Sequence, residues 1–80
     1  MKYENDVRKI LSEFKTNILV DIINLDDNLE LIGINSLLFV SLIVKIEEKF
    51  NISFTDENLL LNRTGTIRAL CSQIYNLLEE

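Results

Sequence analysis

The chain contains no histidine, no proline and no tryptophan, and it has a single cysteine. A serine or cysteine nucleophile needs an adjacent base, and the commonest such base, histidine, is missing. The one cysteine, Cys71, cannot form a disulfide within the chain, and an unpaired thiol suits a reducing compartment. No cluster of histidine, cysteine and aspartate has the spacing of a transition-metal site. We therefore expect neither an enzyme nor a metalloprotein.

Long apolar runs and clusters of positive charge are also missing. The longest apolar stretch, residues 37–44, is interrupted by Ser41 and is far shorter than the roughly 20 residues of a membrane span. The N-terminal residues alternate charged and apolar side chains, so no signal peptide is visible. The net charge is −5, and residues 17–35 hold four acids and no base. We expect a cytoplasmic protein that binds neither nucleic acid nor a membrane.

Apolar residues make up 48% of the chain, and they recur with the period of an α-helix in three stretches. Each stretch follows the spacing i, i+3, i+4, i+7, i+11, and the three begin at Val7, Phe39 and Ile67. Asn35 and Thr66 stand shortly before the second and third stretches, where N-cap residues are expected. Residues 55–60 would form one further, short helix. The pattern predicts an all-α fold in a single domain over residues 1–80, a four-helix bundle with three longer helices and one short helix.

A long first loop, roughly residues 19–34, joins the first two of these helices. Loops of this length in compact domains tend to be functional or disordered. We expect this one to pack against the bundle, because its large apolar residues include Ile22, Ile23, Leu25, Leu29 and Leu31. Gly33, near its end, lies where a left-handed backbone is allowed.

The second helix has apolar residues on two sides. Its core stripe consists of Phe39, Leu42, Ile43, Ile46 and Phe50. Leu37, Val40 and Val44 lie together on a second side of the helix, away from the core stripe, and Ser41 is close to them. Exposed apolar patches tend to mark partner surfaces, so these four residues form a candidate partner-binding face. The alternative is that the acidic first loop covers this face and makes it part of the core.

Ser36 follows Asn35 at the start of the second helix. A phosphate ester there would lie beside unpaired backbone N–H groups and the positive end of the helix dipole. The hydroxyl is a weak nucleophile by itself, so any chemistry at Ser36 must be supplied by another protein. Taken alone, a serine after an asparagine is more often just part of a helix cap.

The residues around Ser36 carry a family resemblance. Residues 29–37 read LELIGINSL, which resembles the attachment-site motif of acyl and peptidyl carrier proteins. That motif runs leucine, three residues, glycine, one residue, aspartate, serine, leucine. The likeness continues through the acidic pair and phenylalanine that end the second helix, and through residues 55–59 and 66–70. It covers nearly the whole chain and keeps the order of the helices.

The resemblance implies a carrier protein that is not itself an enzyme. Ser36 would take 4′-phosphopantetheine covalently from coenzyme A, through a separate phosphopantetheinyl transferase that uses Mg²⁺. The arm would then hold an acyl, aminoacyl or peptidyl group as a thioester. Gly33 matches the glycine that lets the loop turn into the site. The candidate partner-binding face corresponds to the surface that partner enzymes touch.

The same resemblance implies further partners for a stand-alone, monomeric shuttle, namely a loading ligase or acyltransferase and downstream synthase or tailoring enzymes. Asn35 departs from the family's usual aspartate; it caps a helix about as well, but we expect a more selective transferase. Leu38 and Ser41 stand where carriers of primary fatty-acid synthesis have acidic residues. Recognition should therefore depend more on apolar contact, which favours a specialised polyketide, peptide or other secondary-metabolite pathway.

Two alternatives stay open beside this hypothesis. One is a housekeeping acyl carrier protein of fatty-acid synthesis. The other belongs to a different class, an unmodified all-α adaptor that binds a protein through Leu37, Val40 and Val44. The adaptor explains the apolar face but not the serine motif.

Two further features have structural interpretations. Cys71 falls on the apolar stripe of the last helix and is expected to be a small core residue. Glu47 and Glu48 are neighbours in a helix and point in different directions, so we expect a solvated face and not a paired carboxylate site.

Overall fold

The structure, a computed structural model, describes residues 1–14, 20–54 and 65–79 of the chain. It contains three α-helices, α1 (Glu4–Ser12), α2 (Ser36–Phe50) and α4 (Ile67–Glu79), and these described residues include no strand. Two short 3₁₀ helices, η1 (Val20–Ile22) and η2 (Leu29–Ile32), lie in the connection between α1 and α2. The prediction of a small all-α bundle is confirmed. The short helix predicted over residues 55–60 lies outside the described residues.

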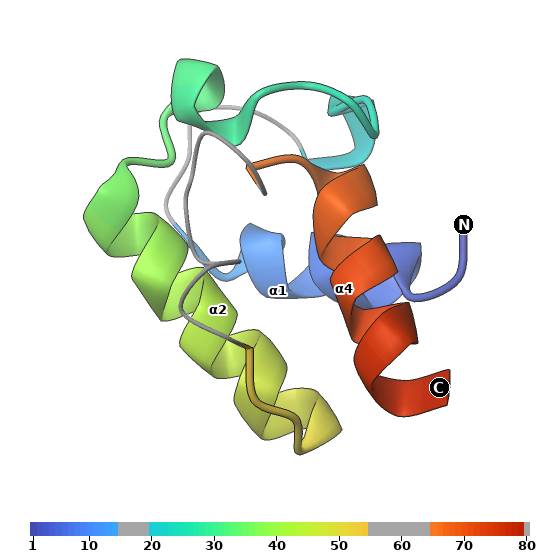
Figure 1. The fold of residues 1–80 in the computed structure, drawn as a ribbon. Coiled ribbons are helices and arrows are strands. Elements are labelled where there is room, and N and C mark those ends of the chain that lie inside the picture. Colours follow the sequence, from blue (N-terminus) through green and yellow to red (C-terminus); the bar gives the residue numbers. More distant parts are fainter. Residues whose placement is uncertain (15–19, 55–64, 80) are drawn as a thin grey trace.

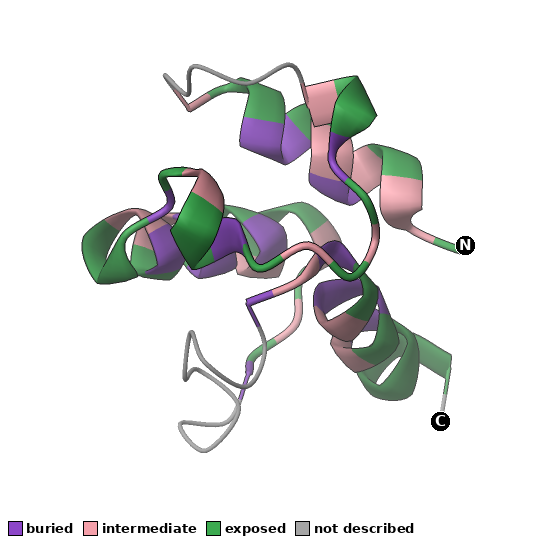
Figure 2. Ribbon diagram, turned by 90° about the horizontal axis from the view of Figure 1, so that it is seen from above, coloured by how far each residue is buried: buried purple, intermediate pink, exposed green. Residues whose placement is uncertain are grey.

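The three α-helices pack around one apolar core. Helix α1 contacts both α2 and α4, and the connection that carries η1 and η2 crosses the end of the bundle where α2 and α4 begin (Figure 1). Each helix turns one buried stripe inward, and its other residues are half-buried or exposed (Figure 2). This arrangement holds α2 against α1 and places its start beside the connection that carries η1 and η2.

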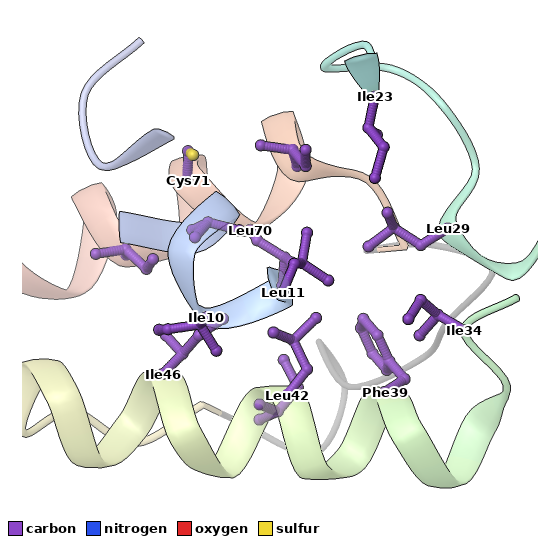
Figure 3. Close-up of a cluster of buried hydrophobic side chains, with 14 of the residues drawn as sticks. Ile10, Leu11, Ile23, Leu29, Ile34, Phe39, Leu42, Ile46, Leu70 and Cys71 are labelled. Carbon is purple, nitrogen blue, oxygen red and sulfur yellow. The ribbon is translucent and has the colours of Figure 1, made fainter. Parts of the chain in front are cut away.

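The core is made from the apolar stripes that the sequence predicts. In Figure 3, Ile10 and Leu11 of α1 lie between Leu42 and Ile46 of α2 on one side and Leu70 of α4 on the other. The residues that are at most 2% exposed include Val7, Leu11, Leu29, Ile34, Phe39, Leu42, Ile46, Ile67, Leu70, Cys71 and Ile74. Full burial of one aliphatic side chain contributes about 1.5–3 kcal/mol, so these contacts dominate the stability of the fold.

Helix α1 is shorter than its apolar pattern. The pattern runs on to Ile18, which lies outside the described residues, but α1 ends at Ser12. The backbone tightens there, because the N–H groups of Glu13 and Phe14 donate to carbonyls three residues back, at 3.1 Å each. Phe14 still packs, half-buried, against the core.

The backbone of the connection between α1 and α2 makes hydrogen bonds to distant parts of the chain. Val20 O accepts from Arg8 Nη1 at 2.6 Å. The backbone N–H of Arg68 donates to Leu25 O at 3.0 Å, and that of Leu29 donates to Gly65 O at 2.8 Å. The loop is thereby tied to the middle of α1 and to the beginning of α4.

The prediction that this loop packs down is right for some of its apolar residues and wrong for others. Ile23 and Leu29 are buried, and Leu25 is half-buried against the core. Ile22 and Leu31 are instead 68% and 81% exposed. In η2 the cause is the 3₁₀ period, which places residues three apart on the same side: Leu29 and Ile32 face the core, so Leu31 faces solvent.

The two ends of the described chain meet at one junction. The carboxylate of Glu79 accepts from Lys2 Nζ at 2.8 Å and from Tyr3 Oη at 2.7 Å. The Tyr3 ring packs edge-on against Phe50 at the end of α2, with ring centroids 5.4 Å apart. The start of α1 and the ends of α2 and α4 are thus joined at the end of the bundle that lies opposite Ser36.

Candidate functional site

The turn that leads into α2 has a defined conformation. Asn28 Oδ1 accepts from the backbone N–H of Glu30 at 2.9 Å and begins η2. Gly33 ends η2 with a φ of 107°, in the left-handed region that glycine adopts without strain. Ile34 then turns back into the core, with only 1% of its side chain exposed. The left-handed backbone expected at Gly33 is therefore present.

Asn35 caps α2 as the sequence predicts. Its backbone is extended, and its Oδ1 accepts from the N–H of Leu38 at 2.9 Å. Its carbonyl accepts from the N–H of Phe39 at 2.8 Å, which begins the helical ladder. Thr66 caps α4 in the same way, through Oγ1 and the N–H of Ala69 at 3.1 Å.

Ser36 is the first residue of α2, and it is exposed. The first N–H groups of a helix have no partner within the helix, and they carry the positive end of its dipole. The first turn of α2 contains no acidic residue that would repel a phosphate. The position is open, and it is electrostatically suited to a phosphate ester on the Ser36 oxygen.

The candidate partner-binding face is exposed beside Ser36. The exposed fractions are 76% for Leu37, 53% for Val40 and 44% for Val44. Ser41 is half-buried among them, and its hydroxyl donates to Leu37 O at 3.3 Å. The first loop therefore does not cover this face, and the alternative of an enlarged core is wrong for these residues.

The remaining reactive groups have structural settings. Cys71 is 1% exposed, and burial raises the pKa of its thiol to about 11. This agrees with the prediction of a core cysteine. The described residues contain no group of histidine, cysteine, aspartate and glutamate that could hold a metal ion. No helix within them is long and apolar enough to cross a membrane.

Sequence reasoning missed two polar residues that support the site from a distance. Glu47 is half-buried, and its Oε2 accepts from the N–H of Phe54 at 2.8 Å, so the solvated face predicted for the acidic pair is right only for Glu48. Arg68 Nε donates to Asp26 Oδ1 at 2.7 Å and ties the acidic loop to α4. Each contact joins a helix residue to a residue outside that helix, and helical periodicity predicts no such contact.

Comparison with known protein families agrees with this geometry. The family described as phosphopantetheine attachment site matches residues 6–74, which is most of the chain. No curated protein and no solved structure matches the chain. The chain belongs to the phosphopantetheine attachment site family.

Membership defines the cofactor and the general role. Members bind 4′-phosphopantetheine covalently on a serine, and the cofactor of this chain is therefore 4′-phosphopantetheine. The chain is a carrier of acyl or peptidyl groups on that arm. Carrier domains of this family are modified by phosphopantetheinyl transferases, interact with synthase enzymes and are generally not catalytic.

Proposed function

We propose that Ser36 is the attachment residue and that the chain, itself not an enzyme, serves a specialised pathway of polyketide, peptide or other secondary-metabolite type. The observation that carries the proposal is the exposed position of Ser36 as the first residue of α2, inside the serine motif. When bound, the arm supplies a terminal thiol that holds an acyl, aminoacyl or peptidyl group as a thioester.

The positions of the other serines support this choice. The chain has five serines, and Ser12, Ser41, Ser53 and Ser72 are the other four. Ser12 ends α1, while Ser41 and Ser72 lie inside α2 and α4. Ser53 follows the end of α2. Of the five, only Ser36 stands at the N-terminus of a helix that the structure describes, where a phosphate is favoured by the dipole and by unpaired N–H groups.

The residues around Ser36 present its hydroxyl but do not activate it. Gly33 turns the chain out of η2, and Asn35 fixes the first turn of α2 through its bond to Leu38. A serine hydroxyl needs a base to become a good nucleophile, and the chain has no histidine. The transferase must therefore supply the base that takes the proton of Ser36.

We assign the docking of partner enzymes to the face formed by Leu37, Val40, Ser41 and Val44. These partners would be a loading ligase or acyltransferase and the downstream synthase or tailoring enzymes. Val40→Glu and Val44→Glu should leave the fold intact, because both side chains are about half exposed. Loading by the partner enzyme should fall severalfold. Loss of folding in either variant would contradict the assignment.

The charge pattern of α2 supports a specialised pathway over housekeeping fatty-acid synthesis. Residues 36–44 contain no charged residue, and Leu38 and Ser41 stand where fatty-acid carriers resemble one another in having acids. Recognition by apolar contact is less sensitive to salt than recognition by charge. A fatty-acid ketosynthase that used the loaded protein as efficiently as its own carrier would remove this part of the proposal.

The first experiment is intact mass spectrometry of the chain after incubation with coenzyme A, Mg²⁺ and a broad-specificity phosphopantetheinyl transferase. We expect a gain of one phosphopantetheine in the wild type and none in Ser36→Ala. A gain of phosphopantetheine in Ser36→Ala would show that another residue is the attachment site. If the wild type shows no gain, the protein purified from its native host decides, since an unmodified Ser36 there would favour an unmodified adaptor.

A further inference from the structure

We propose that Leu31 is a docking residue for the phosphopantetheinyl transferase, and that it inserts into an apolar pocket of that enzyme while Ser36 is modified. The inference rests on the proposed function of Ser36. It adds a contact outside α2, at Leu31 in η2. The sequence predicts that this residue packs against the bundle.

Leu31 is an apolar side chain held out in solvent on a hydrogen-bonded turn. It is 81% exposed, more than any other large apolar side chain among the described residues. Its neighbour Leu29 is fully buried, and the N–H of Leu29 donates to Gly65 O at 2.8 Å. The N–H of Ile34 donates back to Leu29 O at 3.0 Å. A side chain presented on a fixed turn loses less conformational freedom on binding than one on a mobile loop.

The transfer step requires an enzyme to cover this part of the surface. The Ser36 Oγ–phosphorus bond forms while a phosphorus–oxygen bond in the pyrophosphate of coenzyme A breaks. Adenosine 3′,5′-bisphosphate leaves, and the proton of the Ser36 hydroxyl passes to a base of the transferase. The reacting oxygen belongs to the protein surface itself, so the transferase must approach that surface directly. Enzymes that act on the cargo reach it at the far end of the arm, so the transferase is the partner that must contact the Ser36 oxygen itself.

The size of a protein interface brings Leu31 within reach. A standard interface covers about 800 Å² of each partner, which corresponds to a disc of about 16 Å radius. Five residues of fully extended chain span at most about 18 Å. The path from Leu31 to Ser36 is shorter than that, because it includes the end of η2 and the left-handed turn at Gly33. An interface of standard size centred on Ser36 thus extends as far over the surface as Leu31.

The charges around Leu31 indicate the kind of pocket that fits it. Glu30 is exposed next to Leu31, and residues 17–35 contain no base. Asp26 in the same connection is paired with Arg68 at 2.7 Å. The complementary surface is thus an apolar pocket with a positively charged residue at its rim.

The test is the rate at which the apo protein gains the arm, measured by intact mass at limiting protein concentration. We expect kcat/KM to fall about tenfold or more for Leu31→Glu, because burial of a leucine in the pocket is lost. The maximal rate should be nearly unchanged at saturating protein. Ile22→Glu is the matched control, since Ile22 is 68% exposed on the same connection but lies farther along the chain from Ser36. Thermal unfolding of both variants should match the wild type.

The possible results separate this inference from the proposed function. A wild-type protein that gains no arm, in vitro or in its native host, would overturn both. Equal rates for the wild type, Leu31→Glu and Ile22→Glu would overturn only the role of Leu31. Equal losses in the two variants would also overturn it, because they would show a general effect of added negative charge on the connection.

Discussion

Asn35 replaces an aspartate of the family motif and keeps the helix cap. Its amide oxygen accepts the N–H of Leu38 at 2.9 Å, a bond that a carboxylate oxygen would make equally well. What changes is the charge beside Ser36, where α2 has no acid in its first turn. The substitution therefore bears on recognition by the transferase more than on folding.

At Asn35, removal of the cap should be visible as a loss of stability. We expect Asn35→Ala to lower the free energy of unfolding by about 1 kcal/mol, because the N–H of Leu38 loses its acceptor. Asn35→Asp should keep the wild-type stability. Urea unfolding followed by circular dichroism measures both changes, and an unaltered midpoint in Asn35→Ala would show that the cap does not stabilise α2.

At Gly33, a substitution separates backbone strain from steric clash. A Cβ added to Gly33 would meet no atom within 4 Å, but the φ of 107° is unfavourable for any L side chain. We expect Gly33→Ala to destabilise the fold by about 1–2 kcal/mol through backbone conformation alone. Urea unfolding checks this value, and a neutral or stabilising effect would mean that the turn relaxes to another conformation.

Among the elements, α2 is fixed at both ends by side chains that accept backbone bonds. Asn35 acts at its start, and Glu47 reaches past its end to the N–H of Phe54 at 2.8 Å. Asn51 ends the helix in a left-handed conformation, with its N–H donating to Glu47 O. Both ends of the helix that carries Ser36 are therefore set by local hydrogen bonds as well as by the core.

The acidic pair of α2 offers a matched comparison. We expect Glu47→Ala to cost about 1–3 kcal/mol of stability, because the part-buried N–H of Phe54 loses its acceptor. Glu48→Ala should change stability by less than about 0.5 kcal/mol, as exposed substitutions usually do. Thermal or urea unfolding compares the two. Similar effects in both variants would show that the bond from Phe54 to Glu47 does not stabilise the fold and that Glu47 is solvated, as the sequence predicts.

The sequence predicted the elements better than the contacts between them. The three apolar stripes, both helix caps and the turn at Gly33 follow from local rules that act within a few residues. The sequence predicts that Leu31 packs inside, because apolar character alone does not show which side of a loop a residue occupies. The 3₁₀ geometry of η2 sets that side and turns Leu31 toward solvent. The bond of Glu47 to Phe54 depends on a chain path after α2 that no local pattern describes.

In the whole molecule, the junction of Lys2, Tyr3 and Glu79 joins the outer ends of three helices. The hydrogen bond from Lys2, and then that from Tyr3, lowers the pKa of the Glu79 carboxyl below 4.5. The pKa of Glu4 is lowered as well, first by its bond from Arg8. A carboxyl whose pKa is lower in the folded state stabilises that state above its unfolded pKa and loses this contribution as the pH falls through its folded pKa.

This junction predicts a specific pH dependence. Wild-type protein should be more stable than Glu79→Gln at neutral pH, and the difference should shrink as the pH falls below 4.5. Thermal unfolding of both proteins over a series of acidic buffers measures it. Glu48→Gln serves as the control with an exposed carboxylate. A difference between wild type and Glu79→Gln that persists at the lowest pH would show that the junction acts through packing and not through charge.

The burial of Cys71 bears on how long a loaded carrier keeps its cargo. A thioester passes its acyl group to any thiolate that reaches it, and Cys71 is the chain's single thiol. Because its pKa is raised to about 11, only about one Cys71 side chain in ten thousand is ionised at neutral pH. The side chain is also 1% exposed, so self-acylation is blocked by both ionisation and access. A loaded carrier therefore does not lose its cargo to its own thiol, and the cargo leaves only by hydrolysis, by transfer to a thiol of another molecule or by the next enzyme.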